Sequence, residues 1–153
     1  MILKVLITCF MGTYLSAVLF ETPRRSAVVA SVIAAAGYLI YVLLADAVSE
    51  LLAYYIGTLC IVLLCEILAR RIKTPTTTML FPALIALVPG IGLYQTMYAL
   101  AAGDTAFALD TGMNALMIAG CMALAIASGR MIMVLFDSLC LKKSTLCQNM
   151  ARK

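Results

Sequence analysis

The sequence predicts an all-α, polytopic integral membrane protein with five transmembrane helices. Hydrophobic residues make up 65% of the chain and charged residues 12%, compared with ~25% charged residues in ordinary soluble domains. Five apolar runs each approach the ~20 residues that a helix needs to cross the bilayer core. Lysine and arginine gather in alternate connections between these runs, as expected when basic loops stay in the cytoplasm. We therefore expect a multi-pass protein of the inner or plasma membrane.

The first three apolar runs span residues 3–20, 27–45 and 51–69. The second is rich in alanine, glycine and serine, and small residues let neighbouring membrane helices approach closely. Tyrosines lie near or towards the ends of the second and third runs, where amphipathic rings suit the boundary between lipid and water. We interpret them as interface anchors: Tyr38, Tyr41, Tyr54 and Tyr55.

The fourth run, residues 79–100, contains the segment LVPGIGLY at 87–94. Proline removes a backbone donor and glycine permits non-helical dihedrals, so this helix is predicted to break at Pro89–Gly90. The break lies roughly 15 Å into the run, near the bilayer midplane. It could be a simple kink, the tip of a re-entrant hairpin, or a discontinuous helix that binds a ligand.

A discontinuous helix would turn the amides near Ile91 and Gly92 into a new helix N-terminus, whose partial positive charge suits a carboxylate. Transporters use such half-helices for anionic substrate groups. Uncharged polar side chains nearby are further candidates, although they could equally hold helices together. The predicted substrate-binding residues are Pro89, Gly90, Ile91, Gly92, Tyr94, Gln95 and Asn114.

The fifth run spans residues 112–136. Alanines recur four apart along it, which predicts a helix-packing face made by Ala115, Ala119, Ala123 and Ala127. Residues 1–136 are expected to form one transmembrane domain, and residues 137–153 a short basic cytoplasmic tail. No internal repeat is visible, so an inverted-repeat transporter would require a second chain or several copies, and we expect an oligomer.

Basic residues decide the expected orientation. Nine of the eleven fall in the first connection, the third connection and the tail, against Lys4 alone on the other side. Because cytoplasmic loops collect lysine and arginine, the N-terminus is expected outside and the C-terminus in the cytoplasm. The second connection is acidic, and Asp46 and Glu50 are expected to be solvated at the outer rim.

Two charged residues fall well inside predicted spans, away from the start of the chain. Glu66 precedes Arg70 by one helical turn, so it either pairs with Arg70 or takes part in proton coupling. Arg130 precedes Asp137 by two turns. Its long stem could reach the cytoplasmic edge, or its guanidinium could pair with a substrate carboxylate.

Several function classes are not expected. Histidine is absent and no C-x-x-C pair occurs, so no metal site is predicted. The chain lacks a G-x-S-x-G elbow and a Walker glycine loop, which argues against an enzyme. Its net charge of +4 is spread over short loops and a tail, so no basic face for nucleic acid is predicted.

Segments of this chain resemble the threonine/serine exporter (ThrE) family. In that family a basic loop precedes a span containing PLVPG and then a tyrosine, and ARRIKTP at 69–75 followed by FPALIALVPGIGLY at 81–94 is similar to this signature. Pro89, Gly90 and Tyr94 match, whereas Ala86 stands where the first proline of PLVPG is expected.

Upstream, LFETPRRS at 19–26 resembles the family's first cytoplasmic turn, and AAAGYLIYVLL at 34–44 its second span. The resemblance covers nearly the whole chain and matches the small subunit of split, two-component exporters, or the corresponding half of fused ones.

The resemblance implies a subunit of a secondary exporter that moves small carboxylate-bearing solutes, such as threonine and serine, out of the cytoplasm without a cofactor. A larger membrane subunit of the same family is the implied partner. Members of the split type are also associated with dicarboxylates such as succinate, which is an alternative substrate class. A second alternative is a membrane scaffold that stabilises a larger partner without transporting anything, because small-residue packing faces are abundant and intramembrane charge is sparse.

Overall fold

The computed structural model describes residues 2–45 and 47–151, with the side chains of residues 4–45, 47–136 and 138. The predicted rim residue Asp46, the side chain of Asp137 and those of the basic tail therefore lie outside the described residues. The described residues contain helices and no strand, which confirms the all-α prediction. The helices are α1 Ile2–Leu19, α2 Arg24–Ala45, α3 Glu50–Ile72, α4 Thr76–Ile85, α5 Gly90–Ala102 and α6 Thr105–Ala151.

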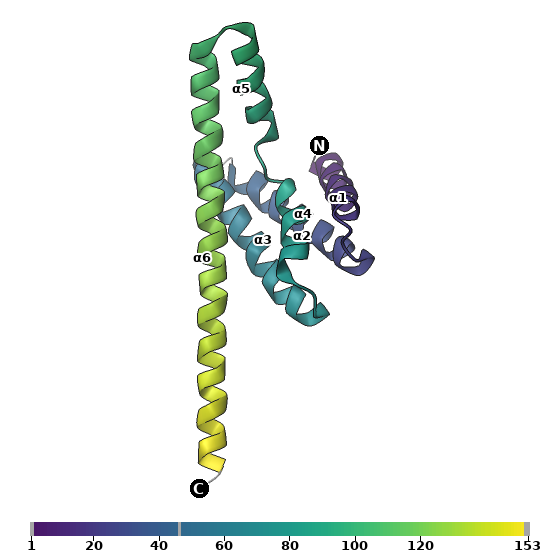
Figure 1. Cartoon of the computed structure of the whole chain (residues 1–153), viewed down its shortest axis with the longest axis vertical. Coiled ribbons are helices and arrows are strands. Elements are labelled where there is room, and N and C mark those ends of the chain that lie inside the picture. Colours follow the sequence, from purple (N-terminus) through teal and green to yellow (C-terminus); the bar gives the residue numbers. More distant parts are fainter. Residues whose placement is uncertain (1, 46, 152–153) are drawn as a thin grey trace.

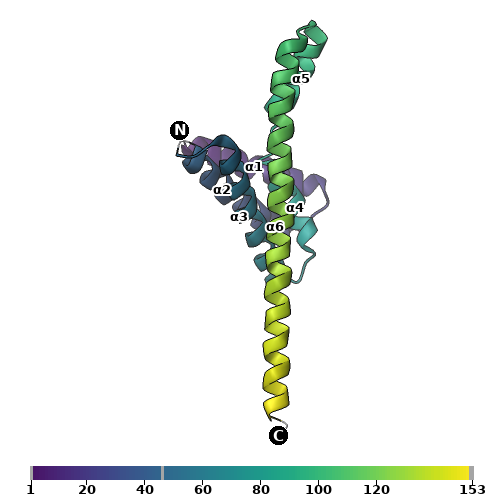
Figure 2. The ribbon, with the colours of Figure 1, turned by 90° about the vertical axis from the view of Figure 1, so that its left-hand side faces the viewer.

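The helices form a body attached to one long rod. Helix α6 has 47 residues, or about 70 Å at 1.5 Å per residue. Helices α1 to α4 pack together beside its middle, with α3 against α6, while α5 folds back along one end of the rod (Figure 1). The view turned by 90° shows both ends of α6 extending beyond the body (Figure 2).

The core of the body forms where α2 and α3 approach closely, because each carries a glycine at the contact. A Cβ atom added to Gly57 would lie 3.3 Å from the carbonyl oxygen of Gly37. The small residues of the second predicted span are accordingly buried, which confirms their packing role. They include Ala27, Ala30, Ser31, Ala34 and Gly37.

The packing face predicted on the fifth span is wrong. Of the four alanines only Ala115 is buried, and the other three are exposed. The buried face of α6 follows alternating steps of three and four residues: Ala115, Ile118, Met122, Ala125 and Gly129. Steps of four alone drift off one face of a helix with 3.6 residues per turn, whereas alternating steps stay on it.

Three helices are long and apolar enough to cross a membrane: Arg24–Ala45, Glu50–Ile72 and the Thr105–Phe136 part of α6. The pair α4 and α5 would add a fourth if its two halves form one broken span. The apolar part of α1, Lys4–Leu19, is shorter, about 24 Å against a core of ~30 Å. The count of five spans and the orientation of the termini stay predictions.

The fourth predicted span is indeed broken. Helix α4 ends at Ile85 and α5 starts at Gly90, and the two are bent by 56°. The connection from α5 to α6 is shorter than predicted, because Gly103 adopts φ +83° and Asp104 accepts a hydrogen bond from the Phe107 amide at 3.2 Å. This cap starts α6 at Thr105, seven residues before the predicted span.

Candidate functional site

A cavity of about 440 Å³ opens at the helix break. We call it the main cavity. Its walls come from α2, α3, α5, α6 and the residues between α4 and α5. Six of the seven residues predicted to bind substrate line it: Pro89, Gly90, Ile91, Gly92, Gln95 and Asn114.

Unpaired amides face this region because of the local backbone. Pro89 precedes α5 with φ −75° and ψ 63°, and the Gly90 amide donates to the Val88 carbonyl at 2.7 Å. The Leu93 amide donates to the Pro89 carbonyl at 3.2 Å. Between them, the amides of Ile91 and Gly92 have no acceptor in the part of the chain that the structure describes. A helix N-terminus with free amides attracts anions.

A cluster of tyrosines forms another wall. The rings of Tyr38 and Tyr41 lie 5.7 Å apart, and those of Tyr41 and Tyr54 4.4 Å apart. All three line the main cavity and are half-buried, and their position at the lipid–water boundary stays a prediction. The sequence contains one sign of this tyrosine cluster. Tyr38 and Tyr41 are three residues apart, so they share one face of a helix whose buried residues are mostly small.

A carboxylate completes the polar surface of the main cavity. Glu50, the first residue of α3, lines it together with Tyr54. Glu50 is exposed, as predicted, and it lies at the edge of the main cavity. The main cavity therefore combines free amide donors with a negative side chain. Sequence reasoning missed this role because Glu50 and the break are about forty residues apart in the chain.

Tyr94 is the predicted site residue that the structure does not bring into the main cavity. It is 70% exposed and stacks on Tyr98, with 6.4 Å between the ring centroids. The reason is the rotation of the helix. Each residue turns by about 100°, so Tyr94, two residues after Gly92, points about 200° away from the direction of Gly92. Gln95, three residues after Gly92, returns to the cavity face.

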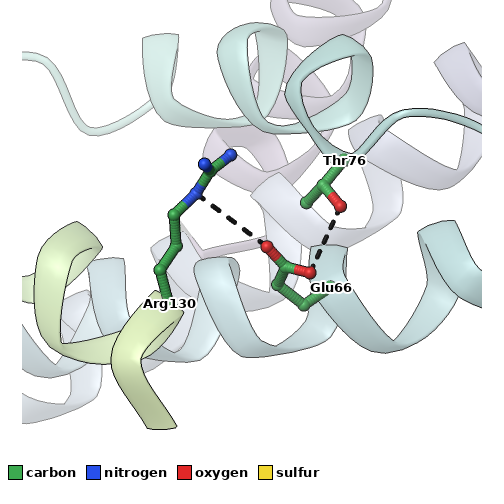
Figure 3. A network of polar contacts seen from close by, with 3 residues as sticks. All are labelled: Glu66, Thr76 and Arg130. Atoms are coloured by element: carbon green, nitrogen blue, oxygen red, sulfur yellow. Dashed lines mark hydrogen bonds and ion pairs between the residues drawn. The ribbon is translucent and has the colours of Figure 1, made fainter. Parts of the chain in front are cut away.

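The two charged candidates, Glu66 and Arg130, meet each other. Glu66 Oε1 lies 3.9 Å from Arg130 Nε, and the Thr76 hydroxyl donates to Glu66 Oε2 at 3.2 Å (Figure 3). Glu66 is 14% exposed and Arg130 46%. This network joins α3, α6 and the first residue of α4, so Arg130 has a partner within the described protein.

The Glu66 network lies far from the main cavity. Glu66 follows Glu50 by sixteen residues on α3, and Arg130 follows Asn114 by sixteen on α6, which is about 24 Å along each helix. The structure thus separates the charged candidates from the cavity residues. No cluster of three or more potential metal ligands occurs among the described residues.

The fold and this site define an α-helical membrane protein with a cavity at a discontinuous helix, an arrangement that transporters use for their substrates. A family model described as "Threonine/Serine exporter, ThrE" matches residues 5–132. The chain belongs to this family of transporters. No curated protein and no solved structure matches the chain.

Proposed function

We propose that this chain is a subunit of a secondary exporter that moves threonine, serine and similar amino acids out of the cytoplasm, and that the main cavity binds the solute. The proposal rests on one observation: the main cavity has free hydrogen-bond donors in one wall and a negatively charged side chain in another. Free amides of Ile91 and Gly92 lie on one side, and the Glu50 carboxylate and tyrosine rings on another.

An amino acid fits this arrangement as a zwitterion. Its carboxylate would accept hydrogen bonds from the Ile91 and Gly92 amides. Its ammonium would face Glu50 and the ring of Tyr41 or Tyr54, which attract cations by charge and by the ring quadrupole. Gln95 and Asn114 line the same cavity and would hydrogen-bond the side-chain hydroxyl of threonine or serine.

The same features disfavour a dicarboxylate. Succinate would bring a second negative charge to the place that the ammonium takes, next to Glu50, and like charges at close range repel. We therefore rank succinate below threonine and serine as a substrate.

We further propose that a larger membrane subunit of the same family packs against α5, within an oligomeric complex. The outer side of α5 exposes large apolar side chains: Leu93, Tyr94, Met97 and Tyr98. Stacked aromatic residues on the side of α5 that faces away from α6 favour protein contact, because aromatic side chains are enriched at interfaces. Tyr94 then serves the interface rather than the solute.

Efflux tests the proposal. Cells loaded with threonine, serine or succinate should lose threonine and serine faster when the chain and its partner are present. Unchanged efflux of all three after deletion of the chain would contradict the proposal. A scaffold role predicts instead that the partner transports alone once its expression is matched, so separate reconstitution of each subunit distinguishes the two.

A single substitution links efflux to the main cavity. A Cβ atom at Gly90 meets nothing within 4 Å, so Gly90→Leu should be accepted by the fold while its side chain fills the cavity and stops threonine efflux. Gly120→Leu is the matched control, because Gly120 on α6 is equally open and lies outside the cavity. Normal efflux by the Gly90 variant would exclude the main cavity as the site.

A further inference from the structure

Leu87 lies in the segment that joins α4 to α5, and its side chain is buried there. It is 2% exposed, whereas the neighbouring Val88 is 49% exposed. Of the described residues 84–98, no other is buried. Leu87 also lines the main cavity, although its side chain has no polar group to offer a solute.

The Leu87 side chain reaches the contact between α2 and α3. A Cβ atom added to Gly57 of α3 would lie 3.8 Å from Leu87 Cδ1 and 3.4 Å from Tyr41 Cβ. Because Gly57 has no side chain, both residues can lie close to its backbone. Leu87 also belongs to the buried cluster that contains Ile61 of α3 and Ala34 of α2. It therefore attaches the connecting segment to the body, beside a tyrosine of the cavity wall.

Helical hydrogen bonds do not hold this segment in place. The Leu87 amide donates to the Leu84 carbonyl at 2.9 Å, and the Gly90 amide to the Val88 carbonyl at 2.7 Å. Both bonds are shorter in sequence than the four-residue step of an α-helix. Where the helical ladder is interrupted, side-chain packing has to fix the path of the chain, and Leu87 is the buried side chain that can do so.

Helix α5 does not pack on the body itself. Among the described helices, α5 packs against α6 alone, whereas α4 packs against α1, α2 and α3 (Figure 1). Helices α5 and α6 approach closely, since a Cβ atom added to Gly112 would lie 3.1 Å from Thr96 Cγ2. The chain thus passes from the body to the α5–α6 hairpin through residues 86–89. The free amides of Ile91 and Gly92 follow immediately after this passage.

We propose that Leu87 is a positioning residue for solute binding. Its side chain, packed beside Gly57 and Tyr41, holds the start of α5 so that the free amides stay opposite the tyrosine and Glu50 wall of the main cavity. Leu87 acts through the backbone that it fixes. Its effect on the solute rests on the proposed function, whereas its attachment of α5 to the body is a property of the chain alone.

Two spin labels measure this attachment without any solute. The full chain with its partner carries labels at Leu52→Cys on α3 and Leu100→Cys on α5, two exposed positions, after the six native cysteines are replaced by alanine. Dilution with unlabelled chain restricts the measurement to pairs within one copy. We expect a single narrow distance distribution for this parent protein and a broader or shifted one after Leu87→Ala. An unchanged distribution would overturn the proposal.

Leu80→Ala is the matched control. Leu80 is 6% exposed and belongs to the same buried cluster as Leu87, but it lies two turns earlier on α4 and does not line the main cavity. The control loses the same atoms from the same core, so its thermal midpoint should also fall, while its distance distribution stays narrow. Equal broadening in both variants would indicate a general loosening of the body and overturn the proposal.

A milder pair keeps the test decisive if the alanine variants do not fold. Leu87→Val removes less of the side chain and should broaden the distribution to a smaller extent, whereas Leu80→Val should not broaden it. Leu87→Met keeps the volume of the side chain and should restore the narrow distribution. A methionine variant as broad as the alanine variant would contradict an attachment by packing.

Binding of radiolabelled threonine then connects the attachment to the solute. The threonine concentration that half-saturates the complex should rise about tenfold in Leu87→Ala, because binding must order the released segment. It should stay near the parent value in Leu80→Ala and Leu87→Met. Unchanged affinity in Leu87→Ala would show that the amides need no such positioning, and would overturn the proposal.

The two measurements distinguish this proposal from the proposed function. If the wild-type complex neither binds nor exports threonine, the proposed function fails, and the spin-label distances still decide whether Leu87 holds α5 in place. If threonine is exported and Gly90→Leu stops it, yet Leu87→Ala leaves the distances unchanged, Leu87 has no positioning role and the main cavity stands.

Discussion

The Glu66 carboxylate and the Arg130 guanidinium lie 3.9 Å apart and connect α3 to α6. The same carboxylate accepts a hydrogen bond from Thr76, the first residue of α4. The far end of α4 leads into the break that forms the main cavity. We therefore propose that this pair holds the start of α4 against α3 and α6. It does not contact the main cavity.

This role predicts a modest effect for Glu66→Gln. Glutamine keeps the size of the side chain and can still accept from Thr76, but it removes the attraction to Arg130. Stability should fall by about 1 kcal/mol or less, measured as thermal unfolding in detergent, while export continues. If Glu66 instead carries a coupled proton, the variant should lose proton-driven export and keep threonine exchange. Glu21→Gln, in the exposed first connection, is the control.

Gly37→Ala should destabilise the body. A Cβ atom there would overlap the side chain of Ile61, which is fully buried, and overpacking of a tight core costs about 1–3 kcal/mol. Thermal unfolding of the purified protein measures the loss. Gly120→Ala, where a Cβ atom meets nothing within 4 Å, should leave the midpoint unchanged or raise it. Equal midpoints for the two variants would contradict the close packing of α2 on α3.

Glu50→Gln should shift substrate preference. Without the carboxylate the ammonium loses its charged partner, so the threonine concentration for half-maximal transport should rise about tenfold. Succinate should compete more strongly, because the repulsion is gone. Transport assays with both solutes measure the ratio. Asp110→Asn is the control, since Asp110 is exposed on α6 outside the cavity, and an identical change in preference there would exclude a specific role for Glu50.

Two substitutions at Tyr41 distinguish the contribution of its ring to threonine binding from that of its hydroxyl. Its ring lies 4.4 Å from that of Tyr54 in the wall of the main cavity. Tyr41→Ala should weaken threonine binding about fivefold through loss of the cation–π contact, whereas Tyr41→Phe should retain most of the affinity. Equilibrium binding of radiolabelled threonine measures both. Matched affinities in the alanine and phenylalanine variants would show that the ring does not contact the ammonium.

Asp104 should stabilise the start of α6. Its carboxylate accepts a hydrogen bond from the Phe107 amide, so Asp104→Ala should cost about 1 kcal/mol. Asp104→Asn keeps the acceptor and should cost much less. Thermal unfolding compares the two, and a similar loss for both variants would point to charge instead of capping.

The helix break and the polar groups beside it could be predicted from the chain alone. Proline and glycine act through local backbone sterics, so adjacent Pro89 and Gly90 favour a helix break at that position. Helical phase is equally local, and it accounts for the exposure of Tyr94 and of the three alanines that follow Ala115.

Composition and local sequence thus determined that this is an all-α membrane protein with a broken helix, because hydrophobicity and backbone sterics need no knowledge of distant contacts. Tertiary structure alone decided that Glu50 and Tyr41 line the cavity at the break, and that Glu66 meets Arg130. These relationships depend on how helices far apart in the chain pack, and that packing follows from side-chain fit between whole helix faces.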